Sequence, residues 1–255
     1  MHKWLVFSSL FIIWISLTLT GISAEELSEK PNEYIPVGER LIYKVSWLGI
    51  PMGTGELWAK EKTTLAGREV IHVVGTFETN KVLSKIFPVH DEAHSWIDTK
   101  TYESVQFEKK VNELVIKAHD IATFDAPKKR GYLESLKTGL KKEFNVTTPV
   151  QDVFSVFYWA RRQDLLPGKS VKTVLTADQK DWDLEVKVHR MENVKLHGTK
   201  ISTIRVEPIT RVGGVEKRGR AWFNLTNDSS RKPVRIIYKA PIGRLTGILK
   251  TVESP

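Results

Sequence analysis

The sequence WDLEVKVH, residues 182–189, has the most regular alternation in the chain. Every second residue from Trp182 to Val188 is apolar, and the residues between them are charged, which is the period-two pattern of a strand buried on one face. Strands with one buried face are typical of antiparallel sheets. This stretch therefore predicts a strand of an antiparallel sheet.

Short segments with the same alternation recur on both sides of it, separated by Gly, Pro, Asp or Asn. We expect strands at 41–47, 70–79, 93–97, 105–108, 113–124, 171–176, 201–207, 221–225, 234–239 and 245–252. A long open sheet coils and leaves exposed edges. The fold class that we predict is therefore mainly β, a large curved antiparallel sheet that is an incomplete barrel or barrel-like. A closed barrel and a sandwich are the alternatives, and residues 38–252 are expected to form a single domain.

One segment departs from this pattern. PVQDVFSVFYWARRQDLLPG, residues 149–168, places Val153, Val156, Phe157 and Ala160 at helical spacing. Asp152 is the expected N-cap, and Pro167-Gly168 is the expected stop. Since the remaining face is also apolar, the helix is predicted to be buried inside the curved sheet, as a plug or lid.

Two short phrases predict turns rather than ligand loops. In SWLGIPMGTGEL, residues 46–57, we expect Gly49 and Gly53 to take positive φ while Pro51 fixes its own backbone, which makes a hairpin with an apolar tip. A similar phrase, APIGRLTGIL at 240–249, contains Pro241 and Gly243 and predicts a second, related hairpin.

The N-terminus predicts export. An uncharged apolar run from Trp4 to Thr20 is followed by GISA, so residues 1–24 are expected to be a signal peptide cleaved after Ala24, with an uncleaved anchor as the alternative. Residues 25–37 are expected to form a flexible lead-in, and the mature chain to be no integral membrane protein. The sequence has no cysteine, which excludes disulfides, thiolate ligands and cysteine nucleophiles.

The net charge of +9 resides in the last quarter of the chain, where residues 190–255 carry 14 Lys and Arg against 5 Asp and Glu. A basic face on the C-terminal strands is predicted, and it would suit anionic lipid or another acidic envelope component. A solvated face with no partner is the alternative. The residues assigned to this face are Arg205, Arg218, Arg220, Arg235 and Lys239.

Motifs for chemistry fail on their context. HDEAH at 90–94 lies in a predicted strand, which separates His90 from His94 by roughly 13 Å, too far for one metal ion. PGKS at 167–170 lacks the first glycine of a phosphate loop, and RVGGVEKRGR at 211–220 is interpreted as a hairpin rather than as an RNA-binding segment. We therefore expect no metal, no cofactor, no nucleic acid and no catalytic residue.

Aromatic side chains are the remaining candidates for a binding site, because they would surround the predicted helix. Plain hydrophobic core is one interpretation, and a cavity for an acyl chain or another apolar ligand is the other. The residues are Trp47, Phe87, Trp96, Phe154, Phe157, Tyr158 and Trp159.

Five phrases, in order, resemble one known family: GERLIYKVSWLGIPMG, FPVHDEAHSWID, QDVFSVFYWAR, ISTIRVEP and RKPVRIIYKAPIG. Together they resemble the domain-of-unknown-function 3108 family (DUF3108) of exported bacterial proteins, from Gly38 to Val252. The resemblance implies a periplasmic or outer-envelope protein of a Gram-negative bacterium and no reaction.

The leading hypothesis from the sequence is a non-enzymatic envelope protein that binds a hydrophobic or amphipathic ligand, a lipid or a lipid-modified protein. An interaction protein that uses the basic C-terminal face is the second hypothesis, and a hydrolase of unknown substrate is the third. No oligomeric state is predicted.

Overall fold

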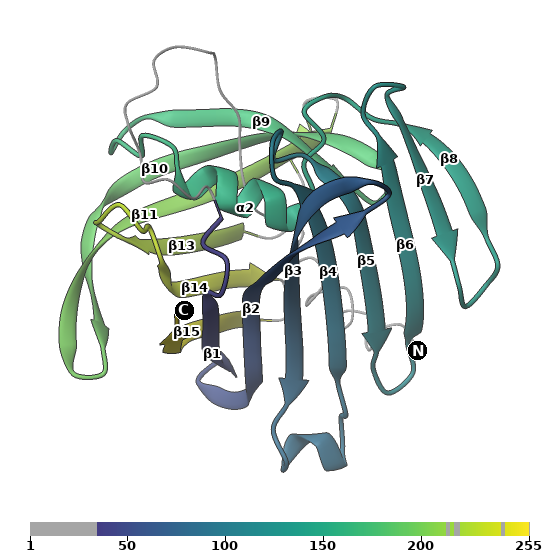
Figure 1. Ribbon diagram of the computed structural model, residues 1–255. Helices are drawn as coiled ribbons and strands as arrows, with labels where there is room; N and C mark the ends of the chain where they lie inside the picture. The colour runs from purple at the N-terminus through teal and green to yellow at the C-terminus, as the bar shows by residue number, and fades with distance from the viewer. Residues whose placement is uncertain (1–34, 213–214, 217–219, 241–242, 255) are drawn as a thin grey trace.

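Figure 1 shows the computed structural model, which describes residues 35–212, 215–216, 220–240 and 243–254. The described strands form one antiparallel sheet in the order β8-β7-β6-β5-β4-β3-β2-β1-β15-β14-β13-β11-β10-β9, and β12 pairs with β11. Their bounds are β1 Arg40–Trp47, β2 Ile50–Leu65, β3 Arg68–Thr79, β4 His90–Asp98, β5 Ser104–Asn112, β6 Lys117–Asp125, β7 Arg130–Ser135, β8 Lys141–Asn145, β9 Ser170–Ala177, β10 Lys180–Leu196, β11 Thr199–Val212, β12 Val215–Glu216, β13 Arg220–Thr226, β14 Pro233–Ala240 and β15 Gly243–Glu253.

The sheet curls but does not close, because β8 and β9 are its two edges and do not pair with each other. The helix α2, Val153–Arg161, lies inside the curve between the two wings of the sheet (Figure 1). The chain between β8 and α2 spans the opening, where the Thr147 amide donates to the Asp181 carboxylate at 2.6 Å and the Thr176 amide donates to the Gln151 carbonyl at 2.7 Å. The predicted incomplete barrel with an internal helix is confirmed.

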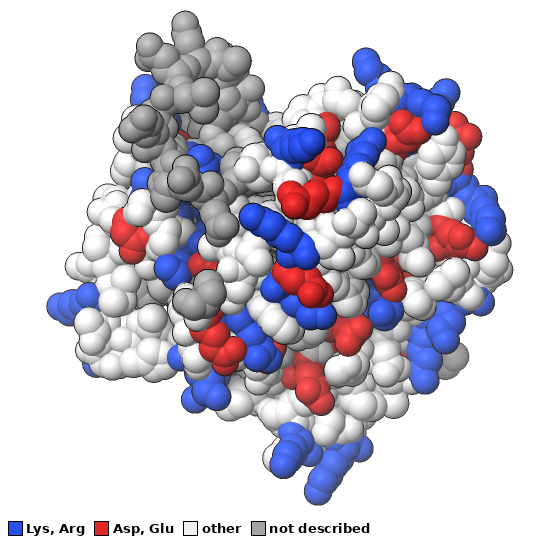
Figure 2. Space-filling model, in the orientation of Figure 1, with Lys and Arg blue, Asp and Glu red and all other residues white. Residues whose placement is uncertain are grey.

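The inner face of the sheet carries the core. Leu41, Tyr43 and Val45 of β1 are buried, as their alternation predicts, and the same pattern continues along β3 and β10. Gly75 of β3 faces the helix, where an added Cβ would lie 2.5 Å from Cζ of Phe154. The absence of a side chain at Gly75 therefore sets how closely α2 approaches the sheet. On the side shown in Figure 2, basic and acidic side chains are interspersed over the surface.

Asp152 caps the helix, as predicted. Its side chain accepts hydrogen bonds from the amides of Phe154 and Ser155 at 2.8 and 2.9 Å, and from the hydroxyls of Ser95 and Ser104 at 2.5 Å each. All four donors serve one carboxyl group, so the start of α2 is fixed to β4 and β5. The helix and its cap thereby close one end of the inner face.

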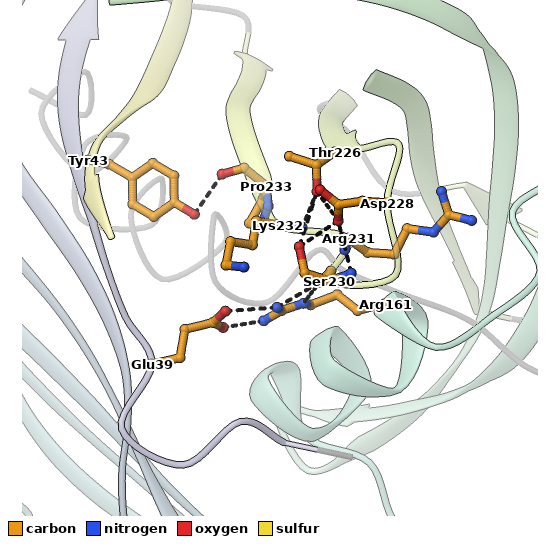
Figure 3. A network of polar contacts seen from close by, with 9 residues as sticks. All are labelled: Glu39, Tyr43, Arg161, Thr226, Asp228, Ser230, Arg231, Lys232 and Pro233. Carbon is orange, nitrogen blue, oxygen red and sulfur yellow. Dashed lines mark hydrogen bonds and ion pairs between the residues drawn. The ribbon is translucent and has the colours of Figure 1, made fainter. Parts of the chain in front are cut away.

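The other end of α2 is held by a buried ion pair, which the sequence did not predict (Figure 3). Arg161 donates to both carboxylate oxygens of Glu39 at 2.5 and 3.0 Å, and to the Ser230 carbonyl at 2.8 Å. Burial would lower the pKa of Arg161, but the hydrogen bonds and the charge of Glu39 raise it. Because this pair fixes Arg161 and Arg162 is the C-cap, the helix ends well before the expected stop at Pro167.

The first predicted hairpin has a two-residue turn, Leu48 and Gly49, whose φ angles are 50° and 89°. The positive φ predicted at Gly49 is therefore confirmed. The prediction of a positive φ at Gly53 is wrong. Gly53 lies inside β2, where an added Cβ would lie 1.9 Å from the Glu78 carbonyl oxygen, so glycine serves close strand approach there. Pro51 also lies in β2, beside a register shift in the pairing with β1.

The second predicted hairpin connects β14 to β15 and lies beside the first. Ala240 pairs with Gly243, whose φ is 137°, and the Leu48 amide donates to the Arg244 carbonyl at 2.9 Å. Pro241, which is predicted to be part of this turn, lies outside the described residues. The two related phrases at opposite ends of the chain therefore form adjacent turns.

Other segments differ from the sequence expectations. The expected flexible lead-in, residues 25–37, is described only at residues 35–37. These pack against the sheet, because Ile35 is buried in the core and Val37 contacts it. Residues 1–24, the predicted signal peptide, lie outside the described residues. In the part of the chain that the structure describes, no helix is long and apolar enough to cross a bilayer.

Candidate functional site

The candidate site is a pocket on the inner face of the sheet, at the opening of the incomplete barrel. It lies beside the start of α2 and not under the middle of the helix. It encloses about 90 Å³. We call it the seam pocket, because one wall comes from β5–β8 and the other from β9, the β9–β10 turn and the start of α2. Its lining residues are Phe107, Lys109, Asp120, Ala122, Phe124, Leu133, Phe144, Asp152, Val153, Thr176, Ala177, Asp178 and Gln179.

The first wall is apolar because three strands bring inward-facing residues into register. Phe107 of β5 pairs with Ala122 of β6, which pairs with Leu133 of β7. The rings of Phe124 and Phe144 meet edge to face at 6.3 Å. Ala122 is the smallest side chain in this row, and the space above it contributes to the hollow between the aromatic rings.

The second wall is made by the turn between β9 and β10. Asp178 and Gln179 both have positive φ, 50° and 61°, which makes a tight two-residue turn. This turn reaches across to the first wall where the hydrogen bonds of Thr147 and Gln151 span the opening. Residues more than fifty positions apart in the chain therefore meet around one pocket.

Polar groups lie at the edges of the seam pocket. Lys109 and Asp120 are paired in register across β5 and β6, on the same face as Phe107. The fully buried Asp152 lies at the other end, and burial raises its pKa despite the hydrogen bonds from Ser104 and Ser95. Since the carboxyl group of Asp152 is already engaged in capping α2, the pocket has an apolar wall with polar groups beside it.

A second, more polar hollow of about 320 Å³ lies where the β3–β4 and β5–β6 turns meet. Glu113 and Asp91 are both buried there, and the Asn112 amide donates to Asp91 at 2.8 Å. Burial, followed by the negative charge and hydrogen bond of Asp91, raises the pKa of Glu113 to about 8. The two carboxyl groups therefore hold a proton between them at neutral pH.

The seven predicted aromatic residues lie elsewhere, and none lines the seam pocket. Phe154, Phe157 and Tyr158 are buried in the core around α2, which we call the main core, and Trp47, Phe87 and Trp159 pack against it. Four of these six belong to α2 itself, and all six lie in the main core or against it. The expectation that Trp96 lies near the helix is wrong, because its position in β4 places it on the outer face.

The outer face of β3 and β4 carries a stack of rings. Trp96 stacks on His72 at 4.8 Å, and Nε2 of His72 lies 3.0 Å from Nδ1 of His94. Burial, followed by the charges of His94 and Lys60, lowers the pKa of His72. His90 and His94 share this face at strand spacing, as expected from the sequence.

Three residues assigned to the predicted basic face are in contact with carboxylates. Arg205 and Arg235 both contact Glu192, at 3.6 and 2.7 Å, and Arg220 contacts Glu207 at 2.5 Å. Burial would raise the pKa of Glu192, but Asn224 and the two arginines lower it. Lys239 is exposed, and Arg218, which is predicted to belong to the basic face, lies outside the described residues.

The pocket residues had only a partial signal in the sequence. Phe107 lies in the predicted strand 105–108, and Phe124 ends the predicted strand 113–124. Phe144 lies in the edge hairpin β7–β8, where the sequence pattern predicts no strand. The turn at Asp178 belongs to the site only through the curvature of the sheet, which no local pattern encodes.

The geometry defines a class: an open, barrel-like antiparallel sheet with an internal helix and a pocket at its opening. Comparison with known proteins agrees, since the chain belongs to the family described as "Protein of unknown function (DUF3108)", whose model matches residues 42–250. No curated protein matches the chain by sequence.

Solved structures are also similar to this chain, and two of them follow. A beta-barrel-like protein of the domain of unknown function DUF1849 from Brucella abortus has a TM-score of 0.59 and 14% identity, over 86% of this chain and 98% of that one, and shares the fold. A Bacteroides fragilis protein with a YmcC-like fold has a TM-score of 0.36 and 8% identity, over 88% of this chain and 98% of that one. A TM-score of 0.36 is too low to show that the two proteins share a fold.

Proposed function

We propose that this protein is a non-enzymatic, exported envelope protein that holds the apolar chain of a lipid or a lipid-modified protein in the seam pocket. The observation that carries the proposal is the row of Phe107, Phe124 and Phe144 around the small Ala122, open between the two edges of the barrel. Export is proposed from the apolar run at the N-terminus of the sequence.

The size of the pocket limits the ligand. About 90 Å³ is less than the ~150 Å³ of a cavity that holds one benzene molecule. A whole lipid does not fit inside it. We therefore propose that the end of one acyl chain inserts between the aromatic rings, while the rest lies along the seam toward Lys109 and Asp120.

The other two hypotheses have less support. A contact surface on the C-terminal strands would require basic side chains that are not already neutralised, and Arg205, Arg220 and Arg235 each have a carboxylate partner. A hydrolase that attacks through a serine or threonine would require a hydroxyl group activated by a base. Two hydroxyl groups, those of Ser84 and Thr79, line the hollow beside Glu113. Within the described residues, neither of them hydrogen-bonds to a carboxylate or to a histidine.

The experiment is a titration with a fluorescent fatty acid that brightens in an apolar environment. Ala122→Phe places a ring in the seam pocket, so we expect probe binding to weaken at least about tenfold, since the apolar contact area is lost to the inserted ring. Thr123→Phe is the matched control, because Thr123 is the neighbouring residue of β6 and is exposed on the other face.

Equal melting temperatures of the two variants would show that both remain folded. Loss of binding in Ala122→Phe alone supports the seam pocket. Unchanged binding in Ala122→Phe, or no binding by the wild-type protein, would contradict the proposed function.

A further inference from the structure

Four hairpin tips of the N-terminal half of the sheet each carry a pair of large, exposed apolar side chains. The tips connect β1 to β2, β3 to β4, β5 to β6 and β7 to β8; the β3–β4 tip includes the short 3₁₀ helix η1, Leu83–Lys85, which contains no buried residue. We call residues 48–50, 81–87, 113–117 and 136–140 the tip edge. The apolar pairs are Leu48 with Ile50, Val82 with Ile86, Leu114 with Val115, and Leu136 with Leu140.

These tips lie at one end of the molecule, along the lower edge of Figure 1. Asn80 hydrogen-bonds to backbone carbonyls of β2 at 2.9 and 2.8 Å, which ties the second tip to the first. The bridge between Val89 and Glu113 ties the second to the third, and the Leu136 amide donates to a carbonyl of β6 at 2.7 Å. The tip edge is therefore one continuous surface.

The opposite ends of the same strands are different. The turns at 66–67, 99–103 and 126–129 connect β2 to β3, β4 to β5 and β6 to β7, and no large exposed apolar side chain of the described residues lies in them. Strand twist and turn geometry apply equally to both ends. The concentration of apolar side chains at one end is thus a property of this sequence and not of hairpins in general.

Charge on the tip edge has one sign. Lys81, Lys85, Lys117 and Lys137 are exposed, and none of them is in an ion pair with another described residue. The acidic residue in these segments, Glu113, is buried, and its raised pKa leaves it mostly uncharged at neutral pH. Figure 2 shows basic side chains projecting at the lowest point of the molecule, with uncharged surface next to them.

We propose that the tip edge docks the protein onto an anionic lipid bilayer, with the four apolar pairs inserted among the acyl chains and the four lysines at the headgroups. Val82 and Ile86, each 77% exposed, are the most prominent of the pairs. Apolar side chains flanked by basic ones are the combination that binds the interface of an acidic membrane. This surface is separate from the seam pocket and does not rest on the proposed function.

The shape of the tip edge favours a bilayer over a protein partner. The apolar pairs project from four separate turns on a curved rim, whereas a stable protein interface needs a contiguous, well-packed patch. A bilayer deforms around separate tips and offers both an apolar layer and a negative surface. A second copy of this chain would bring Lys81 and Lys85 against the same lysines.

Vesicle flotation tests this proposal with two lipid compositions, phosphatidylglycerol mixed with phosphatidylethanolamine, and phosphatidylcholine alone. The wild-type protein should float with the anionic vesicles, less with added salt, and weakly with phosphatidylcholine. Val82→Ser with Ile86→Ser should lower the partition coefficient about tenfold, because two inserting side chains are lost. Lys81→Gln with Lys85→Gln should lower it by a similar factor, on anionic vesicles only.

The matched control is Leu166→Ser with Met191→Ser, which removes exposed apolar side chains that lie outside the tip edge and should leave binding unchanged. Ala122→Phe should also float like the wild type, which separates this proposal from the seam pocket. Absence of wild-type binding, or equal losses in the control, would overturn the proposal. So would a dimer in light scattering that Val82→Ser with Ile86→Ser dissociates.

Discussion

The two parts of the inner face are filled to different degrees. Beneath α2 the main core is so close-packed that Gly75 has no room for a methyl group beside Phe154. On the wing formed by β5–β8, the buried cluster consists of Phe124, Val146 and Val150 with a few partly buried neighbours, and it leaves the seam pocket open.

The difference shows which part of the inner face of this open barrel is left unfilled. The helix inside the barrel is itself apolar, so its side chains fill the space that it covers. The aromatic residues that were expected to line a ligand site are therefore part of the packed core. A single nine-residue helix does not reach the whole inner face. The unfilled remainder lies at the opening, where the two edges of the sheet approach without pairing.

The largest expected effect is at the anchor of the helix. Arg161→Ala leaves Glu39 as an uncompensated buried charge, so we expect the free energy of unfolding to fall by about 3–5 kcal/mol. Denaturation in urea measures this loss. Arg40→Ala, which removes a half-buried ion pair with Glu56 and a second pair with Glu253, is the control and should lower the free energy of unfolding by only about 1 kcal/mol. Equal losses would mean that the buried pair does not hold α2.

An intermediate effect tests the packing difference directly. Gly75→Val should destabilise the protein by roughly 1–3 kcal/mol, because the new side chain collides with the ring of Phe154. Ala122→Phe adds more volume, but the new ring lies in the seam pocket. The free energy of unfolding should therefore fall by less than about 1 kcal/mol. Thermal unfolding of both variants gives the comparison, and a larger loss for Ala122→Phe would show that the wing is packed as tightly as the main core.

A smaller effect concerns the carboxyl pair of Glu113 and Asp91. The pKa of Glu113 in the folded protein is about 8, above the ordinary value of 4.5, so the folded state binds an extra proton between these values. The contribution is complete below about pH 4.5 and is lost as the pH rises through about 8. Glu113→Gln should therefore flatten the fall in melting temperature between about pH 5 and pH 9. A variant with an unchanged pH profile would contradict the shared proton.

Much of the fold follows from local patterns, and the site does not. Alternation at residues 182–189 and the cap at Asp152 predict the strand and the helix start, because both depend on neighbours in the chain. The same alternation assigns Trp96 to the outer face, with His94 and Glu92, since Ala93 and Ile97 carry the buried positions. Gly53 was predicted to turn because glycine permits two roles, positive φ and close approach, and only the register with β3 distinguishes them.

The seam pocket depends on how far the sheet curls. Phe107 and Gln179 line the same hollow although they belong to opposite wings. Their meeting is set by the accumulated twist of many strands and by the segment that spans the opening. Arg161 illustrates the same limit, because its partner Glu39 lies 122 residues away in the chain.

The most direct test of the account is to locate a bound acyl chain. The protein is incubated with a fatty acid that carries a photoreactive diazirine at the end of its chain, irradiated, digested and mapped by mass spectrometry. Labels on the segments that contain Phe107, Phe124 and Phe144, absent in Ala122→Phe, are the predicted result. Labels confined to the α2 peptide that contains Phe157 and Tyr158, with none on β5–β8, would contradict the claim that the ligand enters at the seam pocket.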